Sequence, residues 1–168
     1  GICDQSDSGL KLDISEIEFK NQIRYVHYPT KESRGVCWAR KSVQDLYDNE
    51  KYYCQIDSHM LFDDSWDEYL KGYLNKIKQF NELPIISCYP RPFEVINFEN
   101  KEFQKSPENN LTHTLNFIKN KMFVNKTKFC KQQGNVTKQE IVHGCLIAAG
   151  CIFSYGNFVK NVPYNEKY

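Results

Sequence analysis

The sequence predicts an α/β fold built around a parallel sheet. Short apolar runs at residues 24–28, 52–56 and 84–89 have the length and composition of strands. Longer segments with helical spacing separate these runs, and strands that alternate with helices form parallel sheets with right-handed crossovers. The chain has 168 residues, which favours a single domain with a buried core.

The first strand, residues 24–28, is closed by a proline. Gly35 then precedes a helix that runs to the polar residues 48–50. The apolar residues that give this segment its helical spacing are Val36, Ala39, Val43, Leu46 and Tyr47. The next run, residues 52–56, shows little alternation, which is typical of a strand buried on both faces, and it stops at Asp57.

Residues 63–80 form the clearest helix in the sequence. Apolar side chains fall at positions i, i+3, i+4, i+7, i+8 and i+11, namely Trp66, Tyr69, Leu70, Tyr73, Leu74 and Ile77. Ser65 and Glu68 have the spacing of a capping box, which predicts that the Ser65 side chain caps this helix. Residues 84–89 follow as a third strand, which two prolines stop.

The part from residue 90 to residue 134 differs from the rest of the chain. It is rich in Asn, Lys and Phe and has no sustained period, so we expect an irregular excursion with short strands. Such a segment either covers a substrate cleft or is a solvated insertion without a role, and the sequence leaves both open.

The two ends of the sequence have no natural boundary. Residues 1–5 resemble the end of a strand, and residues 141–153 are apolar again, with small residues at Gly144 and at positions 148–150. Residues 158–162 begin a last helix or strand, after which the chain stops. We therefore expect residues 1–168 to be part of a single domain that is incomplete at both ends.

The composition excludes several classes of protein. Hydrophobic residues make up 40% and charged residues 26%, as in soluble globular proteins. The formal net charge of +1 gives no reason to expect nucleic acid or an anionic membrane as a partner. No apolar stretch is long enough to span a bilayer, and no secretory signal is visible. We expect a cytoplasmic protein.

The cysteines support the same compartment. The seven cysteines are an odd number and include no CxxC pair, which argues against a zinc ribbon and favours free thiols in a reducing environment. The glycosylation sequons at Asn110, Asn125 and Asn135 count only if the protein is secreted.

Asp57 and His59 stand where the strand at residues 52–56 ends. Side chains at i and i+2 of an extended segment point the same way, so both can bind one ion. A carboxylate oxygen and an imidazole nitrogen suit manganese or a similar metal, and open α/β sheets bind ligands outside the carboxyl ends of their strands. Phosphate oxygens and water would complete the shell, and a metal on a diphosphate neutralises the charge of a leaving nucleotide. Taken alone, such a carboxylate is more often a helix cap or a surface residue.

Arg34 and Gly35 come just before the first helix. Gly35 lets a backbone approach a phosphate closely, and helix N-termini attract anions. Arg40 lies further along this helix, where its guanidinium can reach a phosphate or a base. The alternative interpretation of Arg40 is a surface ion pair.

Together, three strings resemble one known family: residues 34–40 (RGVCWAR), 52–60 (YYCQIDSHM) and 65–67 (SWD). This is the family of hydroxyproline N-acetylglucosaminyltransferases, which modify a ubiquitin-ligase adaptor protein and have bacterial and viral relatives. Segments 1–5, 87–90, 149–154 and 162–164 fit the same family in the same order. The resemblance therefore covers nearly the whole chain except residues 90–134.

The resemblance implies a GT-A fold, which is a Rossmann-like nucleotide-diphospho-sugar transferase fold. It implies retaining transfer of N-acetylglucosamine from UDP-N-acetylglucosamine to a hydroxyl of a protein hydroxyproline or a glycan. It also implies Mn²⁺ or Mg²⁺ as the cofactor, held by Asp57 and His59. The donor-binding residues that it implies are Arg34, Gly35, Arg40, Gln55, Asp57, Ser58, Ala149 and Gly150.

The sequence departs from the family at both ends. The family's first strand and nucleotide-binding loop should precede Gly1, and an acidic segment with a further metal ligand should follow residue 164. A third protein ligand is therefore not assigned. His143 is a candidate for it, although a histidine beside a strand is more often structural, whereas His27 and His113 belong to no motif.

Two other functions stay open at this point. A partial GT-A core can bind a sugar nucleotide or a protein without turnover, which would make the chain a non-catalytic binding module. A phosphodiesterase-like metal hydrolase would require more carboxylate and histidine ligands than four scattered histidines provide.

Overall fold

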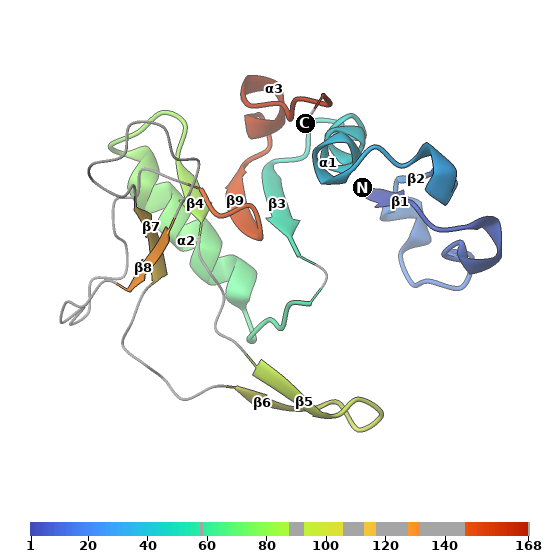
Figure 1. Ribbon diagram of the computed structural model, residues 1–168. Helices are drawn as coiled ribbons and strands as arrows, with labels where there is room; N and C mark the ends of the chain where they lie inside the picture. Colours follow the sequence, from blue (N-terminus) through green and yellow to red (C-terminus); the bar gives the residue numbers. More distant parts are fainter. Residues whose placement is uncertain (58, 88–92, 106–112, 117–127, 132–146, 168) are drawn as a thin grey trace. The chain divides into compact units, whose positions relative to one another are not determined.

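The computed structural model describes residues 1–57, 59–87, 93–105, 113–116, 128–131 and 147–167 (Figure 1). The chain divides into two compact units. The first comprises residues 1–53 and 155–168, and the second comprises residues 54–154.

The first unit contains a parallel strand pair covered by a helix. Strand β1 (Ile2–Asp4) pairs in parallel with β2 (Tyr25–His27), with Ile2 opposite Tyr25. Helix α1 (Val36–Gln44) lies against β1 (Figure 1). Short 3₁₀ turns at Ser8–Leu10, Lys20–Gln22 and Thr30–Glu32 shape the connections. The predicted strands at residues 1–5 and 24–28 and the helix after Gly35 are thus confirmed.

The last helix completes this unit. Helix α3 (Phe158–Asn161) buries Phe158, whose ring centre lies 5.2 Å from that of Tyr53. Gly156 precedes this helix, and its N–H donates to the carbonyl oxygen of Lys51 at 2.9 Å. A Cβ on Gly156 would lie 1.8 Å from the carbonyl oxygen of Glu50, so this turn excludes any side chain.

A three-stranded sheet has the order β3–β9–β4. Its strands are β3 (Tyr52–Ile56), β9 (Cys151–Tyr155) and β4 (Ile85–Ser87), and the border between the two units crosses β3 and β9. Strand β9 is antiparallel to β4. Hydrogen bonds from Asp57 N to Gly150 O and from Gly156 N to Lys51 O show that β9 is also antiparallel to β3.

The sheet corrects two expectations. A purely parallel sheet was wrong here, because the antiparallel β9 lies between β3 and β4. Burial of the strand at residues 52–56 on both faces was also wrong, because Cys54 and Ile56 are exposed. The most buried strand of this sheet is β9, in which the first four residues, Cys151 to Ser154, are each at most 7% exposed and Tyr155 is half-buried. The central strand of the sheet is therefore β9, which comes from the apolar run at residues 141–153 rather than from residues 52–56.

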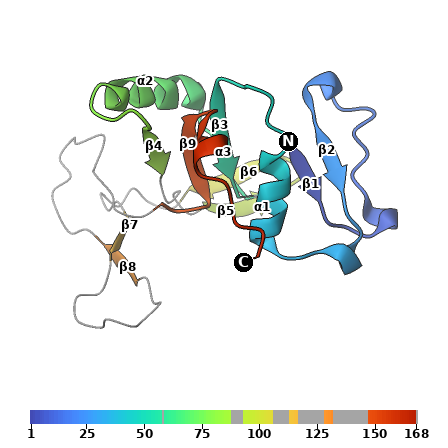
Figure 2. The same cartoon turned by 90° about the horizontal axis from the view of Figure 1, so that it is seen from above.

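Helix α2 (Trp66–Lys78) lies against β4 (Figure 2) and buries Leu74 completely. The predicted capping box is wrong. Ser65 has a left-handed backbone with φ of 58° and its side chain makes no capping hydrogen bond. Lys71 pairs with the carboxylate of Glu68, which explains why that carboxylate does not reach back to the helix start. Acidic side chains in the first turn still favour the helix dipole.

The excursion contains short strands, as predicted. Strands β5 (Phe93–Asn97) and β6 (Glu102–Lys105) form one antiparallel pair, and β7 (His113–Asn116) and β8 (Lys128–Lys131) form another. The sequons at Asn110, Asn125 and Asn135 lie outside the described residues. Cys3, Cys37, Cys54 and Cys151 are free thiols. Within the described part of the chain, no helix has the length and apolar character that a bilayer span requires.

Candidate functional site

The carboxylate of Asp57 lies at the end of β3, directly against Gly150. The N–H of Asp57 donates to the carbonyl oxygen of Gly150 at 3.0 Å. A Cβ on Gly150 would lie 2.5 Å from Asp57 Oδ2 and 3.2 Å from Asp57 Cγ. The carboxylate therefore occupies space that only a glycine at position 150 leaves open.

The turn at residues 148–150 is fastened from both neighbouring strands. The Gln55 side chain of β3 donates from Nε2 to the carbonyl oxygen of Ala149 at 2.5 Å. The Ser87 hydroxyl of β4 accepts from Ala148 N at 2.8 Å and lies 3.1 Å from the carbonyl oxygen of Ala148, to which it donates. Because both neighbouring strands hold this turn, its backbone is fixed beside the Asp57 carboxylate.

Ser87 was not among the site residues predicted from the sequence. The sequence feature that could have identified Ser87 is a hydroxyl side chain at the end of an apolar strand, because a buried polar group needs a hydrogen-bond partner. Both hydrogen bonds of Ser87 go to the Ala148 backbone, so its role is to hold the turn.

The Cys54 thiol, one strand position away from Gln55, is a poor nucleophile at neutral pH. Partial loss of solvent around its sulfur and the neighbouring Cys151 raise the pKa of Cys54 to about 11, so this thiol stays protonated. Asp57 is half-buried and His59 is exposed. The chemistry of this strand end therefore rests on a carboxylate and an imidazole.

The carboxylate of Asp57 and the imidazole of His59 are the side chains that the sequence predicts to share a divalent metal. The described residues contain no group of three or more His, Cys, Asp or Glu side chains that could hold an ion. Asp57 and His59 supply an oxygen and a nitrogen, which suit Mn²⁺, and substrate and water oxygens would have to supply the rest. Ser58 and His143 lie outside the described residues.

The other predicted donor-binding residues lie in the first unit. Gly35 caps α1 with φ of 94° and ψ of 178°, and its carbonyl oxygen accepts from Ala39 N at 3.1 Å. Arg34 is exposed, with its guanidinium carbon 5.8 Å from the centre of the Trp38 ring. Arg40 is half-buried on α1, with its guanidinium carbon 5.7 Å from the centre of the Tyr164 ring.

The structure thus sorts the predicted residues into two groups. Gln55, Asp57, Ala149 and Gly150 meet at the end of β3 in the second unit. Arg34 and Gly35 come just before α1, and Arg40 is in the middle of that helix, in the first unit. His27 Nε2 lies 2.8 Å from the carbonyl oxygen of Ser6 and so has a structural partner.

A second carboxylate, Asp4, ends β1 and organises the loop that follows it. It accepts hydrogen bonds from Ser6 N at 2.9 Å, Leu12 N at 3.0 Å and the Tyr25 hydroxyl at 2.5 Å. Hydrogen bonds from Ser6 and Tyr25 hold the pKa of Asp4 well below its usual range. Burial and this carboxylate raise the pKa of Tyr25 to about 12. This hydrogen-bond network was not predicted from the sequence, because Asp4 and Tyr25 are 21 positions apart.

Comparison with known proteins gives one match. Residues 2–166 match the model of the family described as "Glycosyltransferase (GlcNAc)". No curated protein and no solved structure shows significant similarity to the chain.

Proposed function

Because the chain belongs to the glycosyltransferase (GlcNAc) family, we propose that it transfers N-acetylglucosamine from UDP-N-acetylglucosamine to a hydroxyl group. The proposed transfer depends on Mn²⁺ or Mg²⁺, retains the anomeric configuration and uses a GT-A fold. The proposed acceptor is a protein hydroxyproline or a glycan hydroxyl, as the resemblance of residues 34–40, 52–60 and 65–67 implies.

One observation carries this proposal: the Asp57 carboxylate ends β3 in the space that Gly150 leaves open. In α/β sheets, ligands bind outside the carboxyl ends of strands, and Asp57 follows directly after Ile56, the last residue of β3. The carboxylate lies against the backbone of Gly150, in a turn that hydrogen bonds from β3 and β4 hold in place, and a fixed position is what a metal ligand requires.

Asp57 and His59 would hold the ion, which when bound supplies Lewis-acid stabilisation of the diphosphate leaving group. Gln55 and Ser87 fix the turn at residues 148–150 through their hydrogen bonds to its backbone. The small side chain of Ala149 and the bare Cα of Gly150 let a sugar ring approach this backbone. We propose that Arg40 on α1 contributes a positive charge to a donor phosphate.

In this transfer the bond between the anomeric carbon and the diphosphate oxygen breaks, and the acceptor oxygen forms the new bond on the same face of the sugar. The departing phosphate oxygen takes the hydroxyl proton, so the reaction needs no base from the protein. The residues of this chain therefore act by binding, orienting and neutralising charge.

The test compares Asp57→Asn with the unsubstituted chain in an assay for UDP release from UDP-N-acetylglucosamine with Mn²⁺ and a hydroxyproline peptide. Asparagine keeps the shape of the side chain but removes the charge, so we expect UDP release to fall by about 100-fold or more. Asp48→Asn, the same change at an exposed loop residue, is the matched control.

Equal rates for Asp57→Asn and the control would refute the assignment of Asp57. Donor binding by the unsubstituted chain without release of UDP would instead favour a non-catalytic sugar-nucleotide-binding module.

A further inference from the structure

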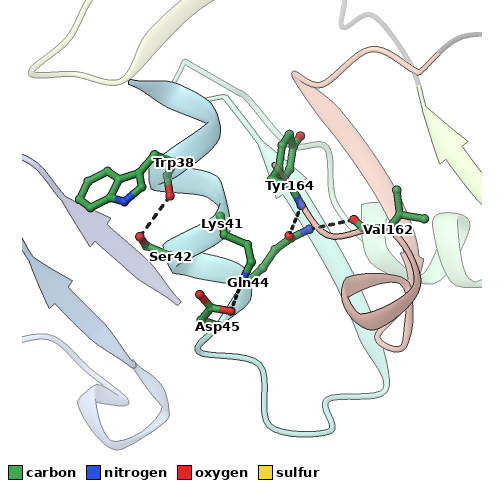
Figure 3. Close-up of polar contacts among 7 residues, drawn as sticks. All are labelled: Trp38, Lys41, Ser42, Gln44, Asp45, Val162 and Tyr164. Carbon is green, nitrogen blue, oxygen red and sulfur yellow. Dashed lines mark hydrogen bonds and ion pairs between the residues drawn. The ribbon is translucent and has the colours of Figure 1, made fainter. Parts of the chain in front are cut away.

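Gln44, the last residue of α1, is buried although its side chain is polar. Only 3% of it is exposed, and its amide points toward the segment at residues 162–164 (Figure 3). Oε1 accepts a hydrogen bond from Tyr164 N at 2.8 Å, and Nε2 donates a longer one to the carbonyl oxygen of Val162 at 3.5 Å. One side chain therefore holds two peptide groups that are about 120 positions away in the sequence.

The residue between these two peptide groups explains why an amide is suited to this position. Pro163 has no N–H to donate, and the backbone groups that Gln44 contacts on either side of it are the Val162 carbonyl and the Tyr164 N–H. The first needs a donor and the second needs an acceptor. A carboxamide offers both at once, whereas a carboxylate offers only acceptors and an apolar side chain offers neither.

The clamped segment places the Tyr164 ring against Arg40. The guanidinium carbon of Arg40 lies 5.7 Å from the ring centre, within the range of a cation–π contact. Arg40 and Gln44 are four residues apart on α1 and therefore share one face of the helix. Gln44 holds the backbone of Tyr164, and the ring of the same residue meets Arg40.

We propose that Gln44 is a positioning residue for donor binding, which acts by holding Tyr164 so that the tyrosine ring orients the Arg40 guanidinium. An arginine side chain has many rotamers, and a ring that restricts them lowers the entropy lost when the guanidinium binds a phosphate. The inference rests on the proposed function, because it takes Arg40 as a donor ligand.

The experiment measures the Kd of UDP-N-acetylglucosamine with Mn²⁺ by calorimetry for variants of the full chain. Tyr164→Phe keeps the ring and Tyr164→Leu removes it, so Tyr164→Leu should bind roughly threefold to fivefold more weakly than Tyr164→Phe. Gln44→Met removes both hydrogen bonds and should weaken binding by a similar factor. Ser42→Ala is the matched control, because the Ser42 hydroxyl donates its hydrogen bond to the Trp38 carbonyl within the same helix.

A double substitution separates positioning from a general loss of structure. If Gln44 acts through Arg40, Gln44→Met should weaken binding no further in an Arg40→Met background, whereas independent effects would multiply. Thermal unfolding of each variant checks that it folds. If Gln44→Met does not fold, the comparison of Tyr164→Phe with Tyr164→Leu still tests whether the Tyr164 ring contributes to donor binding.

The outcomes are distinct. Equal Kd values for Tyr164→Leu and Tyr164→Phe, or multiplying effects of Gln44→Met and Arg40→Met, overturn this inference and leave the proposed function intact. No binding of the donor by the unsubstituted chain overturns the proposed function, and this inference with it.

Discussion

Adding one methyl group at Gly150 should displace the Asp57 carboxylate from its place. The new Cβ in Gly150→Ala would lie 2.5 Å from Asp57 Oδ2. A carbon and an oxygen normally stay roughly 3.3 Å apart, so one of the two groups must move by about 0.8 Å. The φ angle of Gly150 is not in the positive range that only glycine adopts easily, unlike that of Gly35. Alanine at position 150 therefore meets the close contact with Asp57 but adds no backbone strain.

The displacement should reduce activity far more than stability. A metal ligand has to stay within about 0.5 Å of its productive place, and a misplacement of about 1 Å lowers the rate roughly 100-fold. We expect kcat/KM for UDP release to fall about tenfold to 100-fold. Rotating the carboxylate away from its preferred conformer should lower the free energy of unfolding by only about 1 kcal/mol.

The assay is steady-state release of UDP at saturating Mn²⁺, with urea unfolding of the same samples. Gly72→Ala on α2 is the matched control, since no atom lies within 4 Å of its added Cβ. That control should keep its kinetics and gain about 0.5–1 kcal/mol of stability, because alanine favours helices over glycine. Unchanged kinetics in Gly150→Ala would refute the reasoning that links this glycine to the Asp57 carboxylate.

The remaining predictions concern the first unit. Gly35→Ala should lower the free energy of unfolding by about 1–3 kcal/mol, because φ of 94° with ψ of 178° is a backbone conformation open almost only to glycine; urea titration measures it, and an unchanged midpoint would contradict it. Asp4→Asn should be less stable than the unsubstituted chain at neutral pH, because the pKa of Asp4 is lower in the folded chain than its ordinary value of 3.8. A lowered carboxyl pKa stabilises the folded state above the unfolded-state pKa, and this contribution is lost as the pH falls, so the two unfolding curves should converge below about pH 4. A difference that is constant with pH would refute the role of the Asp4 charge.

The sequence predicted local elements well, because their signals are local. The apolar periodicity of residues 63–80 located α2, and the short apolar run at residues 52–56 located β3. The predicted capping box was wrong because the Ser65–Glu68 spacing says nothing about other partners of the Glu68 carboxylate. In the structure this carboxylate forms an ion pair with Lys71. An ion pair with a lysine one helical turn away thus replaces the hydrogen bond that the sequence pattern predicts.

The order of the strands in the sheet could not be predicted from local sequence patterns. Strand β9 comes about 60 residues after β4 and still lies between β4 and β3. Its apolar run was visible in the sequence, but the central place in the sheet depends on pairings between distant segments. Strand order follows from those long-range pairings, which periodicity does not encode.

The candidate site was predictable in part. The strand end at Asp57 and the small residues Ala149 and Gly150 were singled out from the sequence, and the structure brings them together. Ser87 and Gln44 were not singled out, because each acts on the backbone of a residue more than 60 positions away. Single polar residues in apolar or helical segments carry no signal of their distant partner.

The most direct test of the account is calorimetric titration of UDP-N-acetylglucosamine into the unsubstituted chain and into Asp57→Asn, each with and without Mn²⁺. If the Asp57 carboxylate binds an ion that contacts the donor diphosphate, Mn²⁺ should strengthen donor binding at least tenfold in the unsubstituted chain, on the order of the effect of losing one metal partner. The same Mn²⁺ should have little effect in Asp57→Asn. An equal effect of Mn²⁺ on both proteins, or no effect on either, would contradict the account.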